Sequence, residues 1–283
     1  MILEGVNNLL IGCESTVSSI RYLLKKRERN INENHDKSSD QEKSNNILRK
    51  NPNLNICDFN RRICIFTTAS LPWMTGTSVN PLLRAAYLSR GRPKYNITLA
   101  LPWIQMEDQI KLFPSHSLFE NQETQKKYVK QWLCSAELKK ESEDINIVFY
   151  DGVYHEAFGS IFPVTDLTSL VNDSEADICI LEEPEHLNWF KPEGAIWTNK
   201  FNYVIGIIHT NYIFYASQEI GGIIKKEVVR MVSAWMARAH CHRVIKLSGA
   251  LQTYASEKEV VCNVHGVRSE FLEIGSSNKF DSL

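Results

Sequence analysis

Short apolar segments alternate with helical patterns through most of this chain, and this alternation constrains its fold more than any other feature. The segments are mostly apolar on both faces, as expected of strands in a parallel sheet covered on both sides. The predicted strands are residues 63–67, 96–101, 146–150, 178–181, 204–208, 244–247 and 260–264. Helical patterns lie between several of them, at 80–90, 122–138 and 223–239. Strands that alternate with helices predict an α/β fold with a doubly wound parallel sheet.

Two further stripes of apolar residues recur at helical spacing. One lies in the last predicted helix and consists of Ile224, Val228, Met231, Trp235 and Ala239, which share a face. The other lies near the N-terminus and consists of Val6, Leu10, Cys13, Val17, Ile20 and Leu24; it is followed by the basic residues Lys25, Lys26, Arg27 and Arg29. This N-terminal stripe is compatible with a helix packed against the body of the protein. It is also compatible with an amphipathic segment on an anionic membrane surface.

The residues after the N-terminal stripe are poor in apolar side chains. From residue 25 to residue 46 the only aliphatic residue is Ile31. Such a segment buries too little surface to offset the entropy of ordering it, which predicts a disordered linker. Residues 1–60 therefore form one predicted unit, an amphipathic N-terminal segment and its linker. A separate domain is predicted to start at residue 61.

Composition excludes several broad classes of protein. The formal net charge is −1 over 283 residues, so no global basic field indicates a nucleic-acid partner. The seven cysteines contain no CxxC pair, which disfavours a disulfide framework and a structural zinc site. No apolar run reaches the roughly 18 residues of a membrane-spanning helix. A membrane role is therefore expected to be peripheral.

The first predicted strand leads into a polar loop and then a helix. The loop contains Pro72, Trp73 and Gly76; Asn80 is the predicted helix cap, with Pro81 in the first helical position. Backbone N–H groups at such a helix N-terminus can hold an anion, for example a phosphate. An ordinary strand–helix connection would have the same pattern, because the loop is neither GxxxxGK[ST] nor GxGxxG.

Polar residues cluster after four of the predicted strands. In open α/β sheets, ligands bind beyond the carboxyl ends of the strands, so these clusters are expected to meet at one edge. The first contains Thr75, Gly76 and Thr77, the second Glu182, Glu183, Glu185 and His186, the third His209, Thr210 and Asn211, and the fourth His265 and Gly266.

Each candidate has a structural alternative. His209 is either functional or the cap of a following helix. The glutamates at 182, 183 and 185 either face one another, which would raise a carboxyl pKa, or are solvated, with Glu185 capping a helix. Trp73, Trp189 and Trp197 are candidates for an apolar platform under a sugar or a lipid, although core packing suits each of them individually.

Several catalytic motifs do not occur in the sequence. It has no Asp-x-Asp pair, which disfavours the metal-dependent sugar-nucleotide transferases, and no HExxH or GxSxG. A Glu-x7-Glu pattern occurs three times, but none follows a Gly-rich loop in a second domain. We interpret these three matches as chance.

Four segments of the chain resemble the digalactosyldiacylglycerol synthases of plants and algae. They are TTASLPWMTGTSVNPLLRAAYL, LEEPEHLNW, FNYVIGIIHTNY and VCNVHGVRSEFLEIG, which lie between Arg61 and Gly275 in the family's order. The resemblance implies a GT-B glycosyltransferase, whose two Rossmann-like halves face each other across a cleft. Its N-terminal half takes the acceptor lipid and its C-terminal half binds the nucleotide sugar.

The resemblance also implies a reaction and roles for residues. These enzymes transfer galactose from UDP-galactose to monogalactosyldiacylglycerol and retain its α configuration. By this resemblance His209 is the catalytic, sugar-facing residue, and Thr75, Gly76 and Thr77 form the loop that faces the donor phosphates. The remaining candidates for the acceptor and the cleft are Trp73, Glu182, Glu183, Glu185, His186, Asn211 and His265. No metal and no cofactor besides the substrate UDP-galactose is expected.

The chain departs from the family in its length. Residues 61–268 match the acceptor-binding domain, residues 269–283 resemble the start of the interdomain hinge and a tail, and the donor domain is absent from this sequence. The expected function is thus that of a synthase acceptor half that is incomplete without a donor half. The alternative is a non-catalytic lipid- or membrane-binding module. The expected partners are a galactolipid, a membrane surface, no nucleic acid and possibly a separate donor half; the expected location, from the resemblance alone, is the outer chloroplast envelope.

Overall fold

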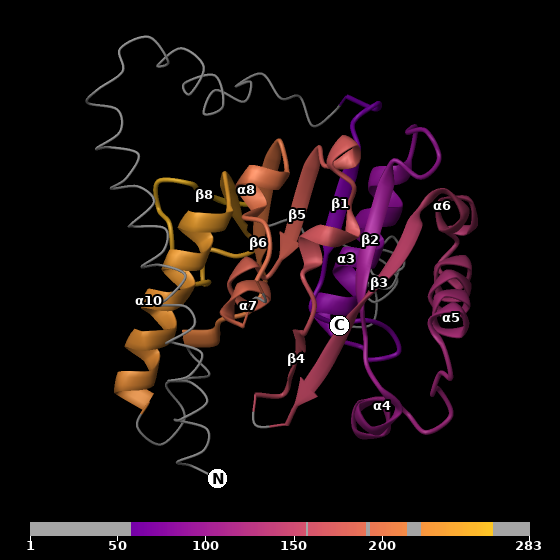
Figure 1. Cartoon of the computed structure of the whole chain (residues 1–283), viewed down its shortest axis with the longest axis horizontal. Coiled ribbons are helices and arrows are strands. Elements are labelled where there is room, and N and C mark those ends of the chain that lie inside the picture. The colour runs from indigo at the N-terminus through magenta and orange to yellow at the C-terminus, as the bar shows by residue number, and fades with distance from the viewer. Residues whose placement is uncertain (1–57, 157, 191–192, 214–221, 263–283) are drawn as a thin grey trace, which may run out of the picture.

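The computed structural model describes residues 58–156, 158–190, 193–213 and 222–262. Within these ranges the chain forms one eight-stranded sheet with helices on both of its faces (Figure 1). The predicted N-terminal segment, nearly all of its linker, and the predicted hinge at 269–283 lie outside the described residues. The domain boundaries that the sequence indicates at residues 61 and 268 therefore stay predictions.

The sheet confirms the predicted doubly wound α/β fold. Its strands stand in the order β4-β3-β2-β1-β5-β6-β7-β8, and all neighbours are parallel except β3 and β4. All seven predicted strands are present, and β4 is an additional strand that forms a hairpin with β3. The strands are β1 (Ile63–Phe66), β2 (Ile97–Trp103), β3 (Asn146–His155), β4 (Ser160–Pro163), β5 (Ile178–Glu182), β6 (Tyr203–Ile208), β7 (Arg243–Lys246) and β8 (Glu259–Val261).

The direction in which the chain adds strands reverses at β1. From β1 the chain moves outward to β2 and β3, and it later returns to place β5 on the other side of β1. Phe66, at the end of β1, pairs with Ala100 of β2 and with Leu181 of β5. In open sheets of this kind, ligands bind beyond the carboxyl ends of the strands at this switch point. The loops after β1 and β5 therefore occupy the most probable binding position that the fold offers.

The described residues form seven α-helices and two short 3₁₀ helices beside the sheet. The helices are α3 (Gly76–Ser89), α4 (Met106–Leu112), α5 (Gln122–Ser135), α6 (Lys139–Asp144), α7 (Pro184–Trp189), α8 (Trp197–Lys200) and α10 (Gly222–His240), with short 3₁₀ helices at Leu167–Leu170 and Asp173–Glu175. Among the described residues, no helix combines the length and the apolar character needed to cross a bilayer.

The helical pattern predicted at 122–138 ends earlier than expected, after α5. Glu137 has a φ of 63°, and the backbone N–H of Leu138 donates back to the carbonyl of Leu133.

Alternate residues of β1 point into two separate hydrophobic clusters. Ile63 and Ile65 join residues of α3 and α5 in one cluster, whereas Cys64 and Phe66 join residues of α7, α8 and α10 in the other. All four side chains are buried. The apolar run of β1 is therefore explained by burial on both faces.

The start of α3 corrects the sequence prediction. The helix begins at Gly76, with Thr75 as its N-cap, so Asn80 is not the cap and Pro81 lies inside the helix. Pro81 has no N–H to donate to the carbonyl of Thr77, one turn earlier. The hydroxyl of Thr67 donates to that carbonyl instead. The loop after β1 thus satisfies the group that the proline leaves without a partner, which allows the helix to start a full turn earlier than predicted.

Candidate functional site

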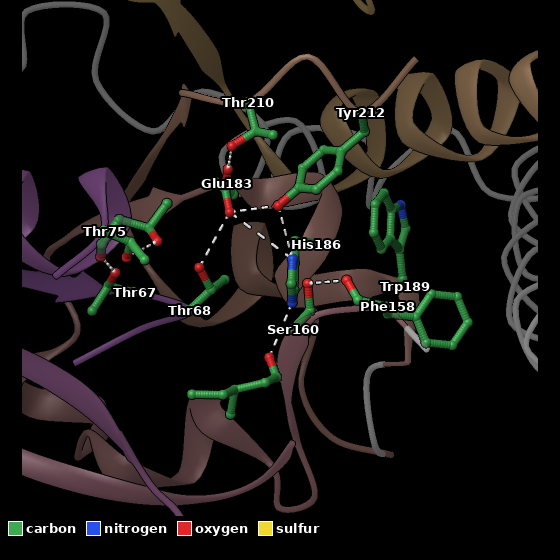
Figure 2. A network of polar contacts seen from close by, with 12 residues as sticks. Thr67, Thr68, Thr75, Phe158, Ser160, Glu183, His186, Trp189, Thr210 and Tyr212 are labelled. Carbon is green, nitrogen blue, oxygen red and sulfur yellow. Dashed lines mark hydrogen bonds and ion pairs between the residues drawn. The ribbon is translucent and has the colours of Figure 1, made fainter. Parts of the chain in front are cut away.

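Three of the four predicted polar clusters meet at the carboxyl edge of the sheet. The loop after β1 contacts the N-terminal turn of α3 through Thr67 and contacts Glu183 through Thr68. The loop after β6 contacts both glutamates that follow β5, since His209 bonds to Glu182 and Thr210 bonds to Glu183. The fourth predicted cluster, with His265, lies outside the described residues. Figure 2 shows the part of this network around Glu183.

An ionic chain connects α3, β5 and the loop after β6. The guanidinium of Arg84 donates from Nε to Glu182 Oε1 at 2.7 Å, and His209 Nε2 contacts Glu182 Oε2. The side chain of Glu182 is completely buried, that of Arg84 is 26% exposed and that of His209 is 7% exposed. The side chain of His209 is therefore largely enclosed, although the residue as a whole is only half-buried.

The charge of Glu182 determines which nitrogen of His209 carries the proton. Burial opposes ionisation of Glu182, but hydrogen bonds and charges from His209 and Arg84 outweigh it, and the pKa of this carboxyl lies below its ordinary value. An ionised carboxylate can only accept, so His209 Nε2 must donate to it. In the neutral ring, Nδ1 is then the acceptor.

Glu183 accepts hydrogen bonds from three hydroxyl groups. Oε2 accepts from Tyr212 at 2.6 Å and from Thr68 at 3.2 Å, and Oε1 accepts from Thr210. These donors come from the loops after β1 and β6, so the carboxylate joins both sides of the switch point (Figure 2). The arrangement fixes the positions of the two loops relative to β5.

The backbone of Glu183 is in the left-handed region, with φ 64° and ψ 67°. This conformation costs a residue with a Cβ about 1–2 kcal/mol, and such residues concentrate at functional sites. The sharp turn changes the chain direction between β5 and α7. As a result Glu182 and Glu183, although adjacent in sequence, belong to two different hydrogen-bonded groups.

His186 extends the Glu183 group toward the β3–β4 hairpin. Its Nδ1 lies 2.9 Å from the Tyr212 hydroxyl and its Nε2 lies 3.0 Å from the carbonyl of Ile161. Since a carbonyl only accepts, Nε2 carries a proton. Burial lowers the pKa of His186, although the nearby charge of Glu183 acts in the opposite direction. The ring is stacked between Phe162 and Trp189, which holds its plane.

Glu185 is not the helix cap that the structural alternative predicts, since Glu183 is the N-cap of α7. The side chain of Glu185 is completely buried, and neither of its carboxyl oxygens has a hydrogen-bond partner among the described residues. Burial and the nearby charge of Glu183 raise the pKa of Glu185 well above its ordinary value. The predicted effect of crowded glutamates on a carboxyl pKa is therefore present at Glu185, whereas the pKa of Glu182 is lowered.

The N-terminal turn of α3 is built from small polar residues. The Thr75 backbone N–H donates to Ser78 Oγ at 3.1 Å, the hydroxyl of Thr75 lies 3.0 Å from that of Thr77, and Gly76 begins the helix. Ser78 Oγ in turn donates to the carbonyl of Trp73 at 2.6 Å. These bonds order the loop beside the helix N-terminus, where the macrodipole favours an anion.

The three candidate tryptophans lie in different surroundings. Trp197 is completely buried and packs against Phe66, so core packing accounts for it. Trp73 is half-buried and packs edge-on against Tyr154. Trp189 is half-buried beside His186, so it is the one of the three that lies within the network in Figure 2.

Four residues of this site were missing from the sequence-based candidates. They are Thr67, Thr68, Arg84 and Tyr212. Thr67 and Thr68 stand at the carboxyl end of β1, so the rule used for the other strands would have found them. Arg84 lies more than two turns inside a helix and gives no local signal.

Asn211 is half-buried in the loop after β6, between Thr210 and Tyr212. Within the described ranges, no group of three or more His, Cys, Asp or Glu side chains is arranged to hold a metal.

Comparison with known proteins confirms the resemblance seen in the sequence. Digalactosyldiacylglycerol synthase 1, chloroplastic, of Glycine max is 47% identical over 218 residues, which are 77% of this chain and 27% of the relative. Digalactosyldiacylglycerol synthase 2, chloroplastic, is 44% identical over 219 residues in Lotus japonicus and 46% identical over 215 residues in Arabidopsis thaliana. The chain spans 46% and 44% of those two relatives. No family model matches the chain.

Proposed function

Because this chain is homologous to the digalactosyldiacylglycerol synthases over about 77% of its length, we propose that it forms the acceptor side of a galactolipid galactosyltransferase. The reaction is transfer of galactose from UDP-galactose to monogalactosyldiacylglycerol, with retention of the α configuration. The observation that best supports this proposal is the Arg84–Glu182–His209 chain at the carboxyl edge of the sheet, beside the ordered N-terminus of α3. The chain spans less than half of each relative, so the nucleotide-sugar site belongs to a further part of the enzyme or to a separate one.

In this proposal His209 contacts the transferred galactose. Glu182 holds the Nε2 proton of the ring, which leaves Nδ1 to accept a hydrogen bond from a sugar hydroxyl. Such a contact helps only if it is stronger in the transition state than in the ground state, so the ring has to be held in place before the sugar binds. Glu182 and Arg84 supply that positioning.

The N-terminus of α3 faces the departing diphosphate in this proposal. Negative charge grows on the phosphate as the bond to galactose breaks, and the positive end of a helix dipole stabilises it. Gly76 and Thr77 present backbone N–H groups at that end, and Thr75, whose own N–H is bonded to Ser78 Oγ, caps the helix beside them. UDP-galactose is a substrate here and no resident cofactor is assigned.

The proposal includes a location and partners. The relatives are named chloroplastic, so we propose that this protein belongs to the chloroplast, as a peripheral protein of the outer envelope. A galactolipid acceptor in that membrane is the first partner. A donor half on a separate chain is the second.

The test is a galactosyltransfer assay on two forms of the protein. Radiolabelled UDP-galactose and monogalactosyldiacylglycerol are incubated with the chain itself and with a chimera in which it replaces the matching segment of the Lotus japonicus synthase 2. We expect the chimera to form the digalactosyl lipid, detected by thin-layer chromatography. A folded chimera without product would contradict the proposed function.

His209→Ala tests the proposed catalytic residue in the same chimera. We expect a tenfold to thousandfold lower turnover, because a polar contact to the transition state contributes about 1.4–4 kcal/mol. His116→Ala is the matched control, since His116 is exposed and takes part in none of the contacts described for the site. Equal activity of both variants would return His209 to a structural role.

Glu182→Gln tests the proposed positioning role. The amide has nearly the shape of the acid but can present an N–H to His209, which would favour the other ring tautomer. We expect turnover to fall about tenfold or more with little change in KM, and the pH–rate profile to shift with it. An unchanged profile would show that Glu182 only supports the fold.

A further inference from the structure

The helix α10 has two apolar faces, only one of which is packed on the sheet. Its inward face consists of Ser233, Met236, Ala237 and His240, which recur at helical spacing and are buried. Its outward face carries Met231, which is 46% exposed, and Trp235, which is 38% exposed. These two belong to the apolar stripe that the sequence shows in this helix, so that stripe points away from the core of the described residues.

The outward stripe forms the floor of a shallow groove. Seven residues of α10 line it: Glu227, Val228, Arg230, Met231, Ala234, Trp235 and Arg238. The helix as a whole carries four lysine and arginine residues but only one acidic residue, Glu227. Glu227 is itself paired with Arg230, and Arg238 is paired with Glu257. The groove therefore offers an apolar floor with paired charges at its edge, on a helix whose own residues have a net positive charge, which suits an amphipathic segment.

The N-terminal stripe of this chain has those properties. It runs from Val6 to Leu24 with one apolar residue per helical turn, a length of about 27 Å if helical, against about 17 Å for the groove from Glu227 to Arg238. Residues 1–24 contain Glu4 and Glu14 but only one basic side chain, Arg21. The side chains of residues 1–24 thus have a net charge of −1, opposite in sign to the net charge of +3 on the side chains of α10.

The connecting chain is long enough for this partner to be in the same molecule. Residues 25–57 separate the stripe from the first described residue, Asp58. An extended chain covers about 3.3 Å per residue, so this connection reaches up to about 110 Å. It imposes no restriction on the direction in which the two stripes pair.

We propose that residues 1–24 dock as an amphipathic helix on the outward face of α10, with their apolar stripe over Val228, Met231 and Trp235. The docked helix covers the groove and its exposed apolar side chains. This intramolecular site is independent of the proposed catalytic function. It resolves the two interpretations of the N-terminal stripe in favour of packing against the body of the protein.

A native cysteine makes the proposal testable by cross-linking. Cys13 lies near the middle of the N-terminal stripe and Met231 near the middle of the groove, so the two are close in either pairing direction. We expect oxidised full-length Met231→Cys protein to form an intramolecular bond between positions 13 and 231. Trypsin cleavage in the basic linker, followed by mass spectrometry, identifies the joined peptides.

Two matched controls distinguish docking from chance collision. Lys226→Cys places a thiol on the same helix but away from the stripe, and we expect at least fivefold less bond to Cys13. In the Met231→Cys background, Leu10→Asp puts a charge in the stripe and should lower the yield severalfold. Asn8→Asp puts the same charge on the opposite side of the segment and should leave the yield unchanged.

Three outcomes would overturn the proposal. The first is an equal yield from Lys226→Cys and Met231→Cys. The second is a bond that joins position 231 of two molecules, which would show that a second copy occupies the groove. The third is loss of the 13–231 bond in the Met231→Cys protein when vesicles of anionic lipid are added at neutral pH, together with protection of the thiol at position 231 from a soluble thiol reagent. This result would assign the groove to a membrane surface.

Discussion

Glu185 is a carboxyl group in the core, close to other acids and without a hydrogen-bond partner in the part of the chain that the structure describes. Its burial and the charge of Glu183 both favour the protonated form. In the unfolded chain the same carboxyl ionises near pH 4.5. Above that pH the folded state therefore binds a proton that the unfolded state has released, and stability falls as pH rises until the folded pKa is reached.

Replacing Glu185 by glutamine should remove this pH dependence. The amide stays neutral at every pH. We therefore expect the variant to gain stability relative to the wild type as the pH rises, by about 1.4 kcal/mol of unfolding free energy for each pH unit between 4.5 and the folded pKa. Urea unfolding at several pH values between 4.5 and 7.5 measures the difference. Glu143→Gln, at an exposed position, is the control. Parallel curves for wild type and Glu185→Gln would contradict the assignment.

At the scale of single elements, α3 depends on a hydrogen bond from outside the helix. The hydroxyl of Thr67 bonds to the Thr77 carbonyl, which has no partner at Pro81. We expect Thr67→Val to destabilise the protein by about 1–3 kcal/mol, because it leaves that carbonyl unpaired. In a Pro81→Ala background the helix N–H is restored and the same substitution should cost less. A double-mutant cycle by chemical denaturation measures the coupling, and additive costs would show that the hydroxyl and the proline act independently.

The same helix shows which features the sequence could predict. Burial on both faces made β1 and the other parallel strands evident, and the rule that ligands bind beyond strand ends placed Thr75, Glu182, Glu183 and His209 at one edge. The start of α3 was wrong because the partner of the Thr77 carbonyl comes from another segment. Arg84 was missed for the same reason, since its ion pair joins residues 98 apart. The weak alternation at Ser160–Pro163 also gave no signal for β4, which depends on its pairing with β3.

At the scale of the whole molecule, the two hydrophobic clusters share the central strand. Cys64 and Ile65 are adjacent in β1 but belong to different clusters, so neither cluster can lose its packing without disturbing the strand that supports the other. We expect Leu133→Ala in one cluster and Phe201→Ala in the other to cost about 2–5 kcal/mol each. Both should lower the midpoint of the same single transition, seen by far-ultraviolet circular dichroism and by tryptophan fluorescence. Separate transitions for the two probes would contradict this coupling.

The position of β1 between β2 and β5 also affects how the protein emerges from the ribosome. One side of β1 can pair as soon as β2 has been made, but its other side waits for β5, roughly 110 residues later. At about 5–20 residues per second, this apolar strand keeps an open edge for roughly 5–20 s during synthesis. Over that period the nascent chain presents an unpaired template for other strands, and β5 ends its exposure when it arrives.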